Sequence, residues 1–393
     1  MSRPLDGITV VAVEQAVAAP FATRQLADLG ARVIKIERPG SGDFARGYDT
    51  TVKGLSSYFV WLNRSKESLT LDLKHDAARG VLARLLAKAD VFIENLAPGA
   101  AVRAGLDPAA LHERHPRLIA CSVSGYGSSG PYATKKAYDL LVQSEVGLLS
   151  LTGTDAHPSK VGISVADISA GMYAYSGILT ALLARSKSGR GSVLKVSLFD
   201  ALAEWMSAPA YYTAYGGSAP RRTGAHHASI APYGPYDSRE GGPVYLAIQN
   251  GREWVRFCGD VLRRPELAED SRFRANRDRV THRAALDEAI VGVFSGLSAG
   301  QVVERLDAAG IANARLGAID DFVDHPQLTA RARWSDIDSP SGPLRALLPP
   351  VEMSGVTPAM GAVPSLGQHT DTILAELGFD AGVIASWHKE GLV

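Results

Sequence analysis

The sequence predicts an α/β protein whose first half is a doubly wound, Rossmann-like parallel sheet and whose second half holds a smaller α+β domain. Short apolar runs alternate with helical patterns over the first 200 residues, and these runs are apolar throughout. A strand that is apolar on both faces has to be covered on both faces, as in a parallel sheet between helices. Beyond residue 225 the strands are hairpin-like and the helices follow one another, which is typical of an α+β unit.

The elements of the predicted sheet follow in chain order. Strands are expected at residues 8–13, 32–36, 91–94, 118–122 and 192–198, with helices at 20–29, 77–87 and 170–183. The apolar stretch around the last helix, of about 16 residues, is shorter than the ~20 that a membrane span requires. We therefore expect a buried helix there and no association with a membrane.

The second half yields a different pattern. Helices are expected at 201–212, 254–262, 283–297, 299–309 and 370–377, and hairpin strands at 234–236 and 244–248. Residues 216–224 are rich in Gly, Ser, Pro and Arg, which indicates a linker. We place a large domain at 1–200, to which 335–393 returns, a linker at 201–225 and a small domain at 226–334.

Charge and cysteine content limit the class of protein. The 393 residues hold 41 Lys+Arg and 41 Asp+Glu, so no net charge would draw the chain to nucleic acid or an anionic membrane. The two cysteines, Cys121 and Cys258, lack metal-ligand spacing and favour a reducing compartment. Residues 1–7 carry no apolar signal core. We expect a cytoplasmic protein that binds neither nucleic acid nor membrane.

The first turn of the sheet does not fit a nicotinamide dinucleotide. Glu37 ends the second strand, where such enzymes place an acid on the ribose. The turn at 14–20 reads EQAVAAP, however, and without glycine its backbone could not approach a pyrophosphate. There is also no Walker loop, no G-x-S-x-G elbow and no metal-ligand spacing among the ten histidines. We expect neither a metal nor a redox cofactor.

Several short motifs occur in order along nearly the whole chain. They are PLDGI at 4–8, LGARVIKIE at 29–37, PGSGD at 39–43, NRSK at 63–66, LDLK at 71–74, ENLAPG at 94–99, GYG at 125–127, GRG at 189–191 and LGQHT at 366–370. Together they resemble the class III CoA-transferase family, which includes formyl-CoA transferase and carnitine CoA-transferase. The resemblance implies an enzyme of the EC 2.8.3 type that works as an interlocked homodimer. Its substrates would be acyl-CoA and a carboxylic acid, with no tightly bound cofactor.

Basic residues suited to CoA lie in or just after the predicted strand-to-helix loops: Arg38, Lys74, Arg103 and Lys136. CoA carries three phosphates, and ligands of parallel sheets bind outside the carboxyl ends of the strands. Asn95 follows the strand at 91–94 and could hydrogen-bond the nucleotide or pantetheine. The resemblance places these five residues and Leu71 at the family's CoA-contact positions. The family's early CoA-contacting glutamine corresponds to Val17, so that contact does not carry over.

Asp167 is the predicted nucleophile. It lies just before the apolar helix, and spacing alone also fits an N-cap aspartate. A helix start stabilises a carboxylate's negative charge and would hold it ready to attack. In the resembling family the aspartate at this position attacks the acyl-CoA thioester to form a mixed anhydride. The released thiolate then attacks the anhydride and leaves CoA as a thioester on the aspartate.

Two alternatives share this fold, an α-methylacyl-CoA racemase and a CoA-binding protein without activity. The racemase branch needs a histidine directly before an aspartate, but this chain has Tyr138 before Asp139. A tyrosine, with an ordinary pKa near ~10, is poorly matched to proton abstraction at neutral pH. We expect Tyr138 and Asp139 to shape the acyl pocket or to orient the nucleophile.

Two further features bear on the substrate. Arg46 and Arg64 lie near the predicted CoA entrance and could pair with a second carboxylate, which favours short dicarboxylates with succinyl-CoA as donor. Formyl-CoA transferase has a run of glycines that closes over the intermediate, whereas the matching residues 225–231 read AHHASIA. We expect His227 or Ser229 in this segment to contact the substrate.

Overall fold

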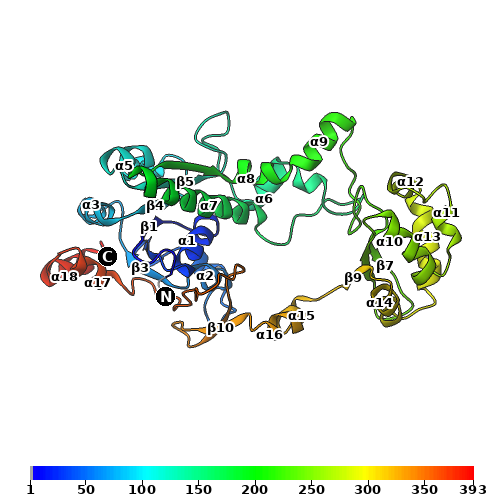
Figure 1. Cartoon of the computed structure of the whole chain (residues 1–393). Helices are drawn as coiled ribbons and strands as arrows, with labels where there is room; N and C mark the ends of the chain where they lie inside the picture. Colours follow the sequence, from blue (N-terminus) through cyan, green and yellow to red (C-terminus); the bar gives the residue numbers. More distant parts are fainter. Residues whose placement is uncertain (1–2) are drawn as a thin grey trace. The chain divides into compact units, whose positions relative to one another are not determined.

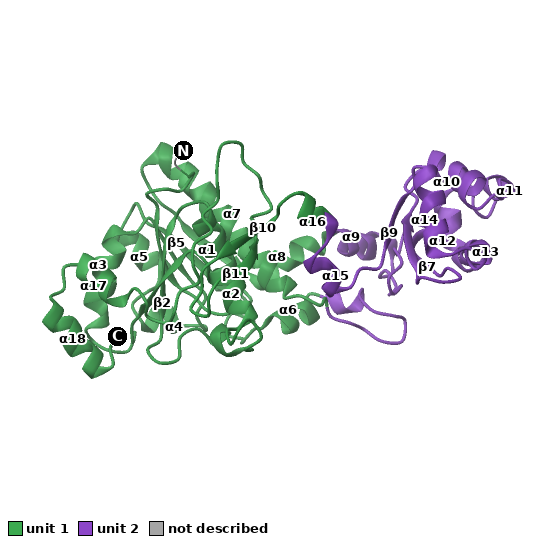
Figure 2. Cartoon of the chain, turned by 90° about the horizontal axis from the view of Figure 1, so that it is seen from below, with its two compact units in different colours: residues 1–146, 161–207, 327–393 green, residues 147–160, 208–326 purple. Residues whose placement is uncertain are grey.

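The computed structural model describes residues 3–393 and divides the chain into two compact units. Unit 1 holds the residues up to 146 together with 161–207 and 327–393, and unit 2 holds 147–160 and 208–326 (Figure 2). The segment 147–160, placed in the large domain from the sequence, groups with unit 2. Its Gly153 carbonyl accepts from the Gly224 N–H at 2.9 Å, and Arg222 donates to the Thr154 carbonyl at 2.7 Å.

Unit 1 is built on a six-stranded sheet in which every strand runs parallel to its neighbours (Figure 1). The strands are β1 (Thr9–Val13), β2 (Arg32–Glu37), β3 (Lys66–Thr70), β4 (Val91–Glu94), β5 (Ile119–Ser124) and β6 (Val193–Ser197). Their order is β3-β2-β1-β4-β5-β6, which confirms the predicted doubly wound sheet. The direction of winding reverses between β1 and β4, so the topological switch point lies between the ends of these two strands.

Helices and one hairpin complete unit 1. They are α1 (Ala18–Asp28), η1 (Phe44–Gly47), α2 (Ser57–Asn63), α3 (Ala78–Lys88), α4 (Ala100–Arg103), α5 (Pro108–Arg114), α6 (Asp139–Glu145), α7 (Val165–Ser188), α8 (Leu198–Trp205), α16 (Pro326–Ala330), β10 (Trp334–Ile337), β11 (Leu344–Leu347), α17 (Thr370–Glu376) and α18 (Ala381–Glu390). Strand β3 was not expected from the sequence, because KESLT is half polar. Its Lys66 and Ser68 are nevertheless buried, and both are bonded to other buried polar groups.

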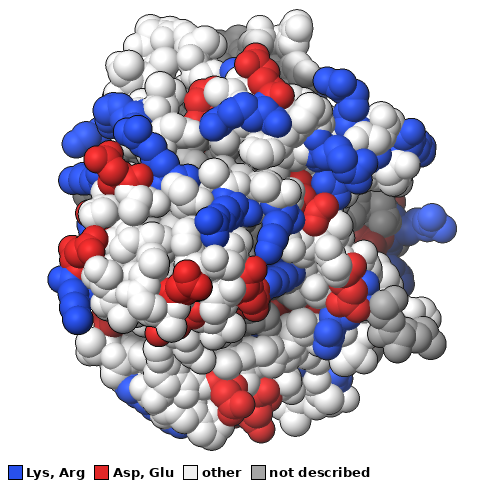
Figure 3. Space-filling view, turned by 90° about the vertical axis from the view of Figure 1, so that its left-hand side faces the viewer, with Lys and Arg blue, Asp and Glu red and all other residues white. Residues whose placement is uncertain are grey.

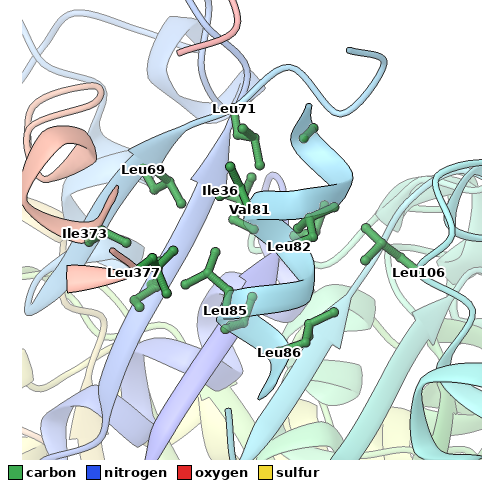
Figure 4. Packing of buried hydrophobic residues seen from close by; sticks show 14 of the residues in the cluster. Ile36, Leu69, Leu71, Val81, Leu82, Leu85, Leu86, Leu106, Ile373 and Leu377 are labelled. Atoms are coloured by element: carbon green, nitrogen blue, oxygen red, sulfur yellow. The ribbon is translucent and has the colours of Figure 1, made fainter. Parts of the chain in front are cut away.

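The C-terminal segment packs against the first sheet. Leu82 and Leu85 of α3 meet Ile36 of β2 (Figure 4). Ile373 of α17 and Leu377, which directly follows α17, join the same apolar cluster. The Thr70 N–H donates to Thr370 Oγ1 at 3.0 Å, which ties β3 to the start of α17. Burial of each of these leucine and isoleucine side chains contributes roughly 1.5–3 kcal/mol to the packing of the C-terminal segment against α3 and the sheet.

Helix α7 differs from its prediction in length and in burial. It begins at Val165, five residues earlier than expected, so Asp167 lies in its first turn. Small residues spaced four apart form its buried face, and Gly171 lies so close to α1 that an added Cβ would stand 2.6 Å from the Ala18 carbonyl oxygen. The opposite face exposes Met172, Tyr173 and Leu183. The expectation of a fully buried helix was therefore wrong for the single chain, because only one face meets α1 and the sheet.

Unit 2 contains a three-stranded antiparallel sheet and several short helices. The elements are η2 (Leu148–Ser150), α9 (Ser207–Gly216), β7 (Tyr233–Tyr236), β8 (Val244–Ala247), α10 (Gly251–Arg256), η3 (Phe257–Val261), α11 (Glu266–Glu269), α12 (Asn276–Thr281), α13 (Arg283–Phe294), α14 (Ala299–Ala308), β9 (Ala312–Arg315) and α15 (Ile319–Val323). The sheet order is β7-β8-β9, and its core centres on Trp254, Phe257 and Phe294. The helix expected at 201–212 is split after Trp205, and Pro209, which lacks an N–H, falls in the first turn of α9.

Basic and acidic side chains both occur across the face seen in Figure 3, as the equal numbers of the two charges predict. Within residues 3–393, no helix is long and apolar enough to cross a membrane. Over the same range, no three His, Cys, Asp or Glu side chains are grouped so that they could hold a metal ion.

Candidate active site

The four basic residues predicted to bind CoA lie in the connections that leave the carboxyl ends of the parallel strands. Arg38 follows β2, Lys74 follows β3, Arg103 ends α4 after β4, and Lys136 lies between β5 and α6. All four side chains are exposed, and none forms a hydrogen bond or ion pair with another residue of the described chain. Free cations at the carboxyl ends of parallel strands are suited to the phosphates of a nucleotide.

Leu71 differs from these four residues. Its side chain is 1% exposed within the apolar core below the sheet, and its N–H donates to the Glu37 carbonyl at 2.8 Å. Because its side chain is buried, Leu71 could contact CoA only through its main chain. This contact stays a prediction.

Asn95 is already bonded to the protein. Its side-chain carbonyl accepts from the Gln15 N–H at 2.8 Å, and its side-chain amide donates to the Gln15 carbonyl at 2.8 Å. Gln15 follows β1 and Asn95 follows β4, so the two hydrogen bonds join the loops on either side of the switch point. The Asn95 amide therefore fixes the loop after β1. One N–H and one carbonyl lone pair of the Asn95 amide remain, and its hydrogen bond to the nucleotide or pantetheine stays a prediction.

A buried cluster of charges lies under the loops after β1 and β2, and sequence reasoning did not find it. Lys35 Nζ contacts Asp43 Oδ2 at 2.7 Å and Glu14 Oε1 at 3.4 Å, and Lys66 Nζ contacts the same Glu14 oxygen at 2.7 Å. All four side chains are buried. Burial alone would raise the pKa of Glu14, but Lys66 and Lys35 lower it. The signal in the sequence is a charged residue inside or directly after an apolar strand, as Lys35 and Glu14 are.

The predicted nucleophile lies beside a second carboxylate. Asp139 Oδ1 accepts from the main-chain N–H of Ala166 at 2.8 Å and of Asp167 at 3.3 Å, and its Oδ2 accepts from Gln143 Nε2 at 2.7 Å. Ser164, the residue at the N-cap of α7, makes no side-chain capping bond. Asp139 therefore supplies the cap of α7, and the N-cap alternative for Asp167 was wrong. No residue of the range 3–393 donates a hydrogen bond to the Asp167 carboxylate.

The surroundings of Asp167 make it a weaker acid. Burial first, and then the negative charge of Asp139, raise the pKa of Asp167 to about 7. Both effects disfavour the ionised form. When such a carboxylate is ionised, it is more basic than an ordinary aspartate. Such a carboxylate is suited to acting as a nucleophile.

Two exposed tyrosines belong to the same region. Burial and the charges of Asp43 and Asp167 raise the pKa of Tyr48, with a smaller effect from Tyr138. Tyr48 lies directly after η1 and its ring meets the Tyr58 ring edge-on at 5.7 Å. Tyr138 is 73% exposed at the N-cap of α6. The structure thus adds Tyr48 to the candidate site, a residue that no spacing in the sequence had indicated.

A family model for CoA-transferase family III matches residues 5–370. The chain belongs to CoA-transferase family III. As a member of this family it is an enzyme of the EC 2.8.3 type, and its substrates are CoA thioesters.

The sequences of this family III transferase and of its relatives align over most of their length. It is 36% identical to acetyl-CoA:oxalate CoA-transferase of Acetobacter aceti over 84% of both chains, and 31% identical to succinyl-CoA:glutarate CoA-transferase of Mus musculus over 100% of this chain and 90% of that one. Among solved structures, a CAIB/BAIF family protein from Brucella suis superposes with a TM-score of 0.83 at 33% identity. That match covers 96% of this chain and 100% of the other.

The transferase does not leave Arg46 or Arg64 free for a substrate carboxylate. Arg46 forms a bidentate pair with Glu37 at 2.8 and 2.7 Å, and its guanidinium lies 3.7 Å from the centre of the Phe59 ring. Arg64 is 3% exposed and forms a bidentate pair with Asp28 at 2.9 and 2.8 Å. Pairing of these arginines with a second carboxylate stays a prediction, and a substrate would have to share them with Glu37 and Asp28.

Residues 225–231 of the transferase are held firmly within unit 2. Arg283 Nη2 donates to the carbonyls of His227 at 2.6 Å and Ile230 at 3.0 Å, and Asn276 Nδ2 donates to the Ser229 carbonyl at 2.9 Å. The His227 ring is exposed and stacks on Tyr233 with centroids 5.2 Å apart. Contact of His227 with substrate stays a prediction.

Proposed function

We propose that this family III enzyme transfers CoA from an acyl-CoA, with succinyl-CoA as the donor, to a short dicarboxylic acid through the carboxylate of Asp167. The observation that carries the proposal is the half-buried Asp167 carboxylate, which has no protein donor and a pKa raised to about 7. Relatives named for oxalate and glutarate support dicarboxylates as the acceptor class.

The proposed reaction has four balanced steps. The Asp167 carboxylate attacks the thioester carbonyl, which forms a mixed anhydride and releases the CoA thiolate. The thiolate attacks the aspartyl carbonyl of the anhydride, which frees the first acid and leaves CoA bound to Asp167 as a thioester. The incoming carboxylate attacks this thioester to form a second anhydride and thiolate. The thiolate then attacks the acyl carbonyl and restores Asp167.

Other residues hold the groups that react. We assign Arg38, Lys74, Arg103 and Lys136 to the CoA phosphates, because all four are free and lie at the carboxyl edge of the sheet. Asp139 orients Asp167 through the main chain, and it opposes ionisation of the Asp167 carboxylate by its own charge. Tyr48, which feels the charge of Asp167, could supply a donor for a developing oxyanion. Tyr138 lies directly before Asp139 and could shape the acyl pocket.

We further propose that the enzyme works as a cytoplasmic homodimer without a tightly bound cofactor. Helix α9 contains Tyr211, Tyr212 and Tyr215, all exposed, and none of its residues is buried. An apolar helix with no buried face calls for a covering surface, and a second copy of the chain is the occupant that the family resemblance implies. Two buried free cysteines fit a reducing compartment. Sedimentation equilibrium should give the mass of two chains, and a monomer at micromolar concentration would contradict the dimer.

The function is tested by giving the enzyme an acyl-CoA donor together with a free-acid acceptor. The enzyme is incubated with succinyl-CoA or another acyl-CoA and a panel of mono- and dicarboxylic acids, and new CoA thioesters are identified by mass spectrometry. Transfer to dicarboxylic acids is expected. If no acid becomes a thioester with any donor, the proposal fails.

The racemase alternative makes a different prediction for the same mixtures. It would introduce solvent deuterium at the α-carbon of a 2-methylacyl-CoA and would form no enzyme-bound thioester. With Tyr138 in place of a histidine, we expect no such exchange.

A further inference from the structure

We propose that the side-chain amide of Gln15 binds an amide of the pantetheine arm of CoA. The inference rests on the proposed function for the identity of the ligand. The family's CoA-contacting glutamine corresponds to Val17 in this chain, so the resemblance assigns no CoA contact to the loop after β1. The inference assigns one, at Gln15.

The first support is the position of Gln15. It follows β1, and its main chain is joined to Asn95 after β4, so it lies at the switch point between β1 and β4. The crevice outside the carboxyl ends of the strands at a switch point is where doubly wound sheets bind their ligands.

The second support is the rigidity of the loop. Asn95 occupies both the N–H and the carbonyl of Gln15, each at 2.8 Å. The next N–H, that of Ala16, donates to Asp43 Oδ1 at 2.9 Å, and Asp43 is anchored by buried Lys35. Ala16 adopts a φ of 62°, a left-handed conformation that costs a non-glycine residue on the order of 1 kcal/mol or more. Such strain persists where surrounding contacts hold it, and here they hold a loop at the binding edge of the sheet.

The third support is the state of the Gln15 side chain. Its Oε1 is buried and accepts no hydrogen bond, and its Nε2 donates none to any residue between 3 and 393. A buried amide oxygen without a partner costs about 1–3 kcal/mol, so an unpaired one in a firmly held loop calls for an outside partner. An amide rotates by 180° without a change of shape, which lets either end face a ligand.

Pantetheine provides the matching chemistry. Its arm contains two secondary amides, each with one N–H donor and one carbonyl acceptor. A primary amide such as that of Gln15 can donate to the carbonyl of one such group or accept from its N–H, and because a secondary amide is trans these two groups point in opposite directions. The phosphates of CoA have no N–H to offer, whereas the adenine amino group does, so the test has to separate the arm from the nucleotide.

The test compares CoA with adenosine 3′,5′-bisphosphate, which lacks the arm, in calorimetric titrations of the full-length protein. Gln15→Met, which keeps the size and removes the polar atoms, should weaken CoA about tenfold, in line with one lost hydrogen bond. It should leave the affinity for the bisphosphate unchanged. Gln25→Met is the matched control, because the Gln25 amide already donates to the Phe21 carbonyl in α1, and it should leave both affinities unchanged.

Equal binding of CoA by Gln15→Met and the wild type would overturn the inference, as would an equal loss for both ligands. If Gln15→Met does not fold, Gln15→Asn keeps the amide but withdraws it by one methylene and should show the same selective loss. The readout does not require turnover. Wild-type protein that binds CoA but transfers nothing would refute the proposed function alone, and active wild type with an unaffected Gln15→Met would refute this inference alone.

Discussion

Asp139 caps the helix that carries Asp167. One Asp139 carboxylate oxygen accepts hydrogen bonds from the N–H groups of Ala166 and Asp167. Burial raises the pKa of Asp167, and the charge of Asp139 adds to this effect. The arrangement positions Asp167, the proposed nucleophile, through its main chain, and within residues 3–393 it leaves the Asp167 carboxylate without a hydrogen-bond donor. It also makes the carboxylate more basic than an ordinary aspartate.

Asp167→Asn should abolish transfer, because an amide cannot form the anhydride or the enzyme thioester. The purified variant should lose all but a trace of activity in the mass-spectrometric assay and should keep its affinity for CoA. Wild type incubated with acyl-CoA and then with hydroxylamine should become inactive and carry a modification on the peptide with Asp167. More than a small percentage of residual activity, with deamidation to Asp excluded by peptide mapping, would place the nucleophile elsewhere.

The pH dependence of kcat/KM for acyl-CoA should show an acid limb near pH 7. Asp167 attacks as the carboxylate, and its pKa is raised to about 7, so activity falls as the pH drops through this value. Asp139→Asn keeps an oxygen for the two N–H groups but removes a negative charge, and it should move the limb to lower pH. The control Asp76→Asn, an exposed aspartate before α3, should leave it in place. If the acid limb of Asp139→Asn lies at the same pH as that of the wild type, the charge of Asp139 does not influence the ionisation of Asp167.

The raised pKa of the Asp167 carboxylate should also affect how the stability of the fold depends on pH. The pKa of Asp167 is raised from the ordinary 3.8 to about 7 in the folded state, so the fold loses stability progressively as the pH rises between these two values, and the loss is complete above about 7. Asp167→Asn should therefore raise Tm by a few degrees at pH 8. Near pH 4 the folded wild type is already protonated, and the gain should largely disappear. A gain of the same size at both pH values would contradict this assignment.

Arg103→Ala should raise KM for acyl-CoA about tenfold with a much smaller effect on kcat at saturation. The reason is that Arg103 is assigned to a phosphate, far from the reacting atoms, and makes a charge-assisted contact there. Arg79→Ala serves as the control: Arg79 is also an exposed arginine but lies in α3, and its loss should leave KM unchanged. An unchanged KM in Arg103→Ala would remove this residue from the CoA site.

The buried charges under the loops should behave as one balanced set. Asp43→Asn leaves an excess positive charge in the interior, and Lys35→Met leaves an excess negative one. Each should cost about 3–5 kcal/mol of stability. The double variant removes both charges, keeps the Glu14 and Lys66 pair at 2.7 Å, and should be more stable than either single variant. Thermal unfolding measures all four proteins, and losses that simply add in the double variant would argue against coupling between Lys35 and Asp43.

The amino-acid sequence by itself determined the parallel sheet and the family, because apolar periodicity and ordered motifs are properties of local segments. It also indicated the loops whose basic residues are proposed to bind CoA. It also located Asp167 at a helix start. Only the tertiary structure decided which polar groups are free. Arg46 and Arg64 look alike in the sequence to Arg38, but strand pairing and helix packing bring Glu37 and Asp28 against the first two and nothing against the third. Burial and pairing depend on residues distant along the chain, so spacing alone does not report them.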